Sequence, residues 1–233
     1  MRQTKGASRR VKALLAAASV VALVGLLGPR PAEANLIGDP TLTNGAGRFG
    51  VGGELDFVLD RDLENGGPAD LETTRLIGNA SFGLTRNIDG FVKLGLFNGE
   101  LSNGGAIDID PGFAIGVGGR ASFVERGDLR FGVLAQVLYF NAELDTVGSP
   151  DIDWIELDIA PALSFRGLGQ IVPYAGLKLS WIDGDVAGVD FENDDLIGIF
   201  GGASFAVSPT ISVGAELRLL DESAIGAFVN FKF

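Results

Sequence analysis

The last eleven residues, Ser223-Ala-Ile-Gly-Ala-Phe-Val-Asn-Phe-Lys-Phe233, decide the fold because apolar residues alternate with small or polar ones. A period of two residues produces two separate faces only in a β-strand. One face of this segment is wholly apolar and consists of Ile225, Ala227, Val229, Phe231 and Phe233. The segment is therefore predicted to be a strand with one apolar side that ends on an aromatic residue.

The same pattern recurs upstream and is marked by a repeated Ser-Phe dipeptide. It occurs at Ser81-Phe82, Ser122-Phe123, Ser164-Phe165 and Ser204-Phe205, with separations of 41, 42 and 40 residues. Each dipeptide closes an alternating segment and is followed by a short polar turn, so one repeat is one long hairpin. The pattern predicts ten strands, with eight as the alternative count.

One face of almost every predicted strand is free of charge, whereas the other face mixes polar, charged and small residues. A soluble β-sandwich would instead carry polar residues on its outward face, and a propeller would place four short strands in each period. The connections are short on one side and mostly longer on the other, at Arg61–Asp70, Asn98–Gly112, Asp145–Asp151 and Asp183–Asp195. Only the connection around Leu220–Ser223 is short on that second side.

This combination resembles the small, porin-like outer-membrane β-barrels of Gram-negative bacteria. The resemblance implies an all-β, transmembrane, antiparallel up-and-down barrel over residues 46–233, embedded in outer-membrane lipid. It also implies that Phe231 and Phe233 belong to the signal that the barrel-assembly machinery reads during insertion. The outward Phe82, Phe123, Phe165, Phe205 and Phe233 are expected to form an aromatic girdle at the periplasmic ends of the strands.

The start of the chain is predicted to be a secretory signal peptide, residues 1–34. Basic residues precede an uninterrupted apolar or small stretch, Ala13–Gly28, and Ala32-Glu-Ala34 supplies the small residues of a cleavage site after Ala34. The apolar stretch is shorter than the roughly 20 residues that a membrane-spanning helix needs. Residues 35–45 are expected to form a periplasmic leader, and the mature protein is expected in the outer membrane.

The composition excludes several kinds of function. The chain has no Cys and no His, which removes disulfides, thiolate metal sites and imidazole chemistry. Enzymes with the resembled architecture rely on a catalytic His, so we expect no enzymatic activity, no catalytic residues and no cofactor. Without residues 1–34, 12 Lys and Arg stand against 29 Asp and Glu, a net charge of −17, which argues against nucleic-acid binding.

Charged residues on the inward faces are expected to line the lumen as a network of both signs: Glu54, Asp56, Arg75, Lys93, Arg120, Glu156, Asp158, Lys178, Glu216 and Arg218. In a narrow barrel, opposite charges from neighbouring strands would meet and pair, which predicts a closed lumen and a structural or surface-interaction role. The alternative is a small porin-like channel or a transporter of a hydrophobic ligand.

The alternation breaks near the outer mouth, where apolar residues face inward. The predicted cluster contains Phe97, Leu138, Phe140, Trp154, Ile182, Leu196 and Phe200, and it is either simple core packing or a pocket for a hydrophobic ligand. The acidic stretch Asp183–Asp195 resembles a calcium loop only poorly. It is expected to be a solvated loop, with Asp183, Asp185 and Asp194 as weak ligand candidates for a divalent cation at the cell surface.

Overall fold

The computed structural model describes residues 36–64, 69–102, 105–186 and 188–233, and the predicted signal peptide lies outside them. These residues form twelve β-strands. The strands are β1 (Phe49–Asp60), β2 (Asp62–Glu64), β3 (Ala69–Gly83), β4 (Ile88–Ser102), β5 (Ala106–Arg126), β6 (Leu129–Glu143), β7 (Asp151–Phe165), β8 (Ile171–Val186), β9 (Val189–Asn193), β10 (Ile197–Ala206), β11 (Ile211–Leu219) and β12 (Ser223–Lys232). None of the described residues forms a helix long and apolar enough to pass through a bilayer.

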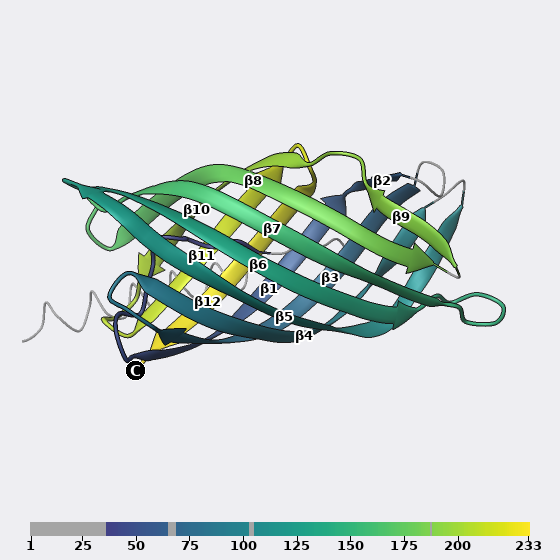
Figure 1. Ribbon diagram of the computed structural model, residues 1–233, viewed down its shortest axis with the longest axis horizontal. Helices are drawn as coiled ribbons and strands as arrows, with labels where there is room; N and C mark the ends of the chain where they lie inside the picture. Colours follow the sequence, from purple (N-terminus) through teal and green to yellow (C-terminus); the bar gives the residue numbers. More distant parts are fainter. Residues whose placement is uncertain (1–35, 65–68, 103–104, 187) are drawn as a thin grey trace, which may run out of the picture. The chain divides into compact units, whose positions relative to one another are not determined.

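Ten of these strands close into an antiparallel barrel (Figure 1). Apart from the short β2 and β9, each strand pairs with the next one in the sequence, and β1 pairs with both β3 and β12. The terminal strand thus closes the ring, with Val51 opposite Phe231 and Phe57 opposite Ile225. The predicted up-and-down barrel of ten strands is confirmed.

The outer surface of the barrel is apolar because one face of each strand points away from the lumen. Leu76 on β3 is 62% exposed and Leu94 on β4 is 65% exposed, and each of the ten strands of the ring contributes at least two exposed large apolar residues. A continuous exposed apolar surface is unfavourable in water and is typical of a surface that contacts lipid.

The two ends of the barrel differ. At the end that we call outer, following the predicted orientation, β2 pairs with β3 and β9, and β9 pairs with β8. The two short strands therefore join β3 to β8 beyond the ends of β10, β11, β12 and β1. The ring of ten strands narrows there to a ring of eight. The C-terminus lies at the opposite, inner end (Figure 1).

The described part of the predicted leader, residues 36–45, lies inside the barrel. Leu36, Ile37, Thr41 and Asn44 are all buried, and Thr41 shares a 2.6 Å hydrogen bond with Ser164 of β7. The polar groups of an extended segment need partners once they leave water, and the lumen wall supplies them. The leader thus fills the inner end of the lumen.

Candidate functional site

The lumen is filled by three successive layers, and β7 shows their order. Its inward residues run from Ile152 and Trp154 at the outer end, through Glu156 and Asp158, to Ala160 and Ala162 towards the inner end. The first pair belongs to an upper apolar cluster and the last pair to a lower apolar cluster. The carboxylates between them belong to a charged layer that separates the two clusters.

The lower apolar cluster is formed jointly by the leader and the barrel wall. Its members are Leu36, Ile37, Phe91, Leu134, Ala160, Ala162, Tyr174, Phe200 and Phe228. The amides of Ile37 and Gly38 donate to the two carboxylate oxygens of Glu216, at 3.0 and 2.9 Å. The amide of Asn44 donates to Asp89 at 2.8 Å. The leader is therefore held by side chains of the wall along its whole described length.

A small cavity remains between the leader and the wall. It has a volume of about 30 Å³ and is lined by Leu36, Glu54, Asn79, Lys93 and Asn230, among others. A cavity of this size holds about two water molecules, and its polar lining would keep them hydrogen-bonded.

The charged layer contains most of the predicted lumen network. Lys178 Nζ lies 3.6 Å from both Glu156 and Asp158, and Arg75 Nη1 lies 3.3 Å from Glu156. Arg218 pairs with Asp56 and, at 2.8 Å, with Glu216. All these side chains are buried, and each pair compensates the cost of removing the other charge from water.

Three members of this layer come from connections rather than from the predicted strand faces. Arg61, between β1 and β2, lies 3.0 Å from both Glu156 and Glu222. Asp221 and Glu222, in the turn between β11 and β12, lie 3.0 and 2.6 Å from Lys178 Nζ. The predicted network did not include them. One feature of the sequence could have indicated this role for Arg61: it is the only Lys or Arg in the predicted outer connections.

Local backbone geometry directs these three side chains inward. Arg61 lies between Asp60 and Asp62, and the alternation of an extended chain turns it to the opposite side. Leu220 has a φ of 89°, which reverses the chain so that Asp221 and Glu222 point into the lumen. A Cβ at Gly198 would overlap the Asp221 carboxylate, so the glycine leaves room for it.

The remaining predicted charges pair nearer the inner end. Lys93 Nζ lies 2.8 Å from Glu54, and Arg120 Nε lies 3.2 Å from Asp89. The Lys93 ammonium also donates to the carbonyl of Leu36 at 3.1 Å. All ten predicted residues therefore lie inside the barrel, but the ion pairs divide them into the charged layer and two separate pairs rather than one network.

The upper apolar cluster contains five of the seven residues predicted for the mouth: Phe97, Leu138, Phe140, Trp154 and Ile182. The Phe140 and Trp154 rings stack with centroids 4.7 Å apart, and Phe97 meets both rings edge-on. The Arg75 guanidinium lies 4.2 Å from the centroid of Phe140, which joins this cluster to the charged layer.

The other two residues were placed wrongly in the mouth. Leu196 precedes β10, is 44% exposed and belongs to neither apolar cluster. Phe200 does face inward, but it lies in the lower apolar cluster, where its ring centroid is 6.3 Å from that of Tyr174. The alternation correctly predicted that Phe200 faces the lumen, but it did not predict the position of Phe200 along the barrel axis.

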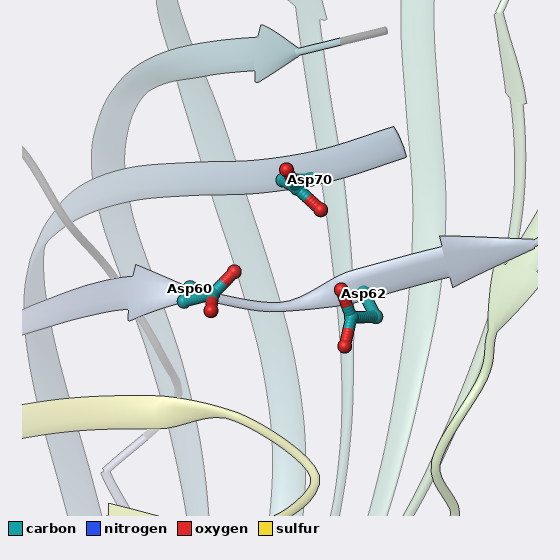
Figure 2. Close-up of side chains that lie close together, drawn as sticks. All are labelled: Asp60, Asp62 and Asp70. Atoms are coloured by element: carbon teal, nitrogen blue, oxygen red, sulfur yellow. The ribbon is translucent and has the colours of Figure 1, made fainter. Parts of the chain in front are cut away.

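The predicted cation ligands Asp183, Asp185 and Asp194 do not gather into one site. Asp183 and Asp185 on β8 lie opposite Glu192 and Asp190 of β9. Among the described residues, the carboxylates that do converge are Asp60, Asp62 and Asp70, whose oxygens lie within 4.8 Å of one another (Figure 2). Three exposed carboxylates in this arrangement could hold a hard divalent cation, which prefers oxygen ligands.

The electrostatics of this group are unfavourable without a cation. Partial burial raises the pKa of Asp62 above its ordinary value, and the neighbouring Asp70 raises it further through a hydrogen bond and through charge repulsion. Asp194 and Asp195 add to the repulsion.

The closed ring, the apolar outer surface and the charged layer inside it define the chain as an outer-membrane-type β-barrel. No protein-family model matches the chain, and no curated protein matches it. Several solved structures do match the chain. An outer membrane channel from Pseudomonas putida F1 is 9% identical with a TM-score of 0.52, over 86% of this chain and 100% of that chain.

The translocator domain of the autotransporter NalP from Neisseria meningitidis is 10% identical with a TM-score of 0.50, over 84% of this chain and 91% of that chain. The outer membrane protease OmpT from Escherichia coli is 11% identical with a TM-score of 0.41, over 79% and 94%. At these identities the likeness to the channel and to the translocator domain shows a common fold, that of Gram-negative outer-membrane barrels.

Proposed function

We propose that the chain is a non-enzymatic outer-membrane barrel with a closed lumen and a structural or surface-interaction role. We further propose that it is exported through cleavage of residues 1–34 and inserted by the barrel-assembly machinery acting on the terminal strand. The observation that carries the closed-lumen proposal is the filling of the lumen by the lower cluster, the charged layer and the upper cluster. Passage of a solute would require breaking all three layers.

The non-enzymatic part is supported by the chemistry of the buried polar groups. The sequence has no His to act as a general base. The carboxylates Glu156 and Asp158 are fully buried next to Lys178, so neither water nor a substrate reaches them in this arrangement. A hydrophobic-ligand site in the mouth has less support, because the side chains of the upper cluster pack against each other.

The surface-interaction part is supported by the charge of the outer end. Eighteen carboxylates lie on its exposed or half-buried surface: Asp60, Asp62, Glu64, Asp70, Glu72, Glu100, Asp108, Asp110, Glu143, Asp145, Asp151, Asp153, Asp183, Asp185, Asp190, Glu192, Asp194 and Asp195. Arg61, the one cation of these connections, points into the lumen. Such a surface attracts cations, so we include divalent cations among the proposed partners.

Single-channel recording in a planar bilayer tests the closed lumen. The purified protein should give no stable current steps, whereas an open porin in the same bilayer gives them. Deleting residues 35–45 should still give none, because the charged layer and the upper cluster remain. Stable stepwise current through the intact protein would refute the proposal and favour the small porin-like channel.

Labelling of intact cells tests the orientation. Cys introduced at Val189, the first residue of β9, should react with an impermeant maleimide, and Cys at Gly127, in the β5–β6 turn, should not. Both positions are exposed, so burial does not explain a difference. The reverse pattern would overturn the orientation.

A further inference from the structure

The charged side chains outside the lumen are divided unequally between the two ends of the barrel. Of the twelve Lys and Arg among the described residues, five are buried in the lumen. The other seven all lie at the inner end: Arg48, Arg86, Arg120, Arg126, Arg130, Arg166 and Lys232. The acidic side chains of this end are Asp39, Asp89, Glu125 and Asp128. Seven positive and four negative charges leave +3 there, whereas the outer end has eighteen carboxylates and no exposed cation.

Four of the seven cations are used within the inner end itself. Two form ion pairs with Asp89 and Glu125, and two donate hydrogen bonds to carbonyls of the leader. The other three, Arg48, Arg86 and Arg126, are exposed. The structure shows no ion pair and no side-chain hydrogen bond between these three and any other described residue. Their guanidinium groups can therefore bind a partner outside the chain.

Arg126 lies on the lipid-facing side of the barrel. In the β5–β6 ladder it is opposite Leu129, which is in turn opposite Phe165 of β7. Directly opposed residues share one face of a sheet, and both Leu129 and Phe165 are exposed. An arginine in such a position covers apolar surface with its stem and extends its guanidinium group to the polar boundary of the membrane.

Arg48 and Arg86 lie beside other exposed apolar side chains of the same rim. Arg48 directly precedes Phe49, whose ring centroid is 4.8 Å from that of Phe82. Arg86 lies in the β3–β4 turn, two residues before the exposed Ile88. Aromatic rings on the outer surface of a membrane barrel mark the level of the lipid headgroups. The three arginines thus lie where the barrel meets the headgroup layer.

The arrangement of the three arginines favours a layer of lipid over a single soluble ligand. They lie before β1, between β3 and β4, and at the end of β5, which are successive positions along one arc of the ring. They therefore do not converge on one point. Arginine binds phosphate oxygens through paired hydrogen bonds, and phosphate groups are present at this level of a phospholipid layer. A headgroup with a net negative charge complements the positive charge of the rim.

We propose that the inner rim is a binding surface for anionic phospholipids, whose phosphate groups pair with Arg48, Arg86 and Arg126. The carboxylates of the outer end repel the same lipids, so the two ends of the barrel differ in the lipid that they favour. The inference rests on insertion of the barrel in a membrane. It is independent of whether the lumen conducts.

Equilibrium binding of lipid in a neutral detergent tests the proposal. The mature protein, folded in dodecyl maltoside, is titrated with phosphatidylglycerol or phosphatidylcholine, which carry the same fluorescent acyl chain. Each basic residue near an anionic lipid raises the affinity by a factor of about five. Phosphatidylglycerol should therefore bind at least about tenfold more tightly than phosphatidylcholine. Added salt should reduce this preference, because exposed charges are screened.

Substitution of the three arginines tests whether they cause the preference. The triple variant Arg48→Gln, Arg86→Gln and Arg126→Gln should bind the two lipids with affinities that agree to within about twofold. If the triple variant does not fold, Arg126→Gln alone replaces it and should reduce the preference by about fivefold.

A matched variant separates the rim from the overall charge. Thr146→Asp, Val147→Asp and Ser149→Asp, in the exposed β6–β7 connection, change the net charge by the same amount at the outer end and should leave the preference intact. Equal affinities of the wild-type protein for the two lipids, an arginine variant that keeps the preference, or an equal loss in the aspartate variant would each overturn the proposal. Displacement of phosphatidylglycerol by an equal concentration of glycerol 3-phosphate would also overturn it, because the site would then be one for soluble phosphate.

Discussion

Replacing Lys178 by Met should severely destabilise the barrel. Its ammonium lies 2.6 Å from Glu222, 3.0 Å from Asp221 and 3.6 Å from both Glu156 and Asp158. Met keeps most of the volume and removes the charge, so the loss reports electrostatics rather than packing. Removal of one partner from a buried ion pair typically costs about 3–5 kcal/mol. We expect a loss in that range.

The charge balance can then be restored within the same variant. Within the described residues, Lys178 is the only cation within 4 Å of Asp158, whose other contact is a hydrogen bond from Gln136 at 2.9 Å. Adding Asp158→Asn to Lys178→Met removes the negative charge that loses its partner. The double variant should therefore be more stable than Lys178→Met alone.

Urea unfolding of protein refolded in detergent measures these differences, with Trp fluorescence and heat-modifiable gel migration as two probes. Arg126→Met, which removes an exposed charge at the inner end, serves as the control and should change stability by less than about 0.5 kcal/mol. The reasoning fails if Lys178→Met costs less than about 1 kcal/mol, or if Asp158→Asn destabilises it further.

Three other predictions follow from the packing, the outer carboxylates and the β11–β12 turn. Trp154→Ala and Phe200→Ala should each lower the free energy of unfolding by about 3–5 kcal/mol. Because the two residues lie in separate clusters, the loss in the double variant should equal the sum of the single losses to within about 0.5 kcal/mol. A larger coupling energy in a double-mutant cycle would contradict this. Because the pKa of Asp62 is raised in the folded protein, repulsion weakens the β2–β3 ladder above that pKa and fades as the pH falls. Mild acid or millimolar Ca²⁺ should therefore raise the protection factor of the Leu71 amide, which compares its exchange rate with the unfolded rate at the same pH. Asp62→Asn should remove the pH dependence of this protection factor, and a protection factor unchanged by both treatments would argue against the repulsion. Leu220→Gly should raise the thermal midpoint by about 2–4 °C, because Leu is strained at a φ of 89°, whereas an unchanged or lower midpoint would count against strain in this turn.

The faces of the strands could be predicted because alternation is a local property of the sequence. The inward position of Glu156 follows from its neighbours Ile155 and Leu157, whatever the rest of the barrel does. The same argument placed Trp154 and Phe140 inside. Their stacking also depends on the β6–β7 register, which sets Phe140 opposite Trp154.

The height of a residue in the barrel could not be predicted in the same way. Phe200 and Trp154 both face inward, but the strands are tilted and staggered, so equal distances from the strand ends do not give equal heights. The leader presented another difficulty. Its polar residues are typical of a solvated segment, and only the acceptors and donors of the lumen wall, such as Glu216 and Asp89, make its burial favourable.

The short connection between β11 and β12 was an exception to the predicted pattern of long outer connections, and the narrowing of the barrel accounts for it. Because β2 and β9 join β3 to β8 beyond the ends of the four shorter strands, a long loop at residues 220–222 would have to displace that ladder. A tight turn fits beneath it and brings Asp221 and Glu222 to Arg61 and Lys178. The turn that breaks the outer-loop pattern is thus the turn whose carboxylates complete the charged layer.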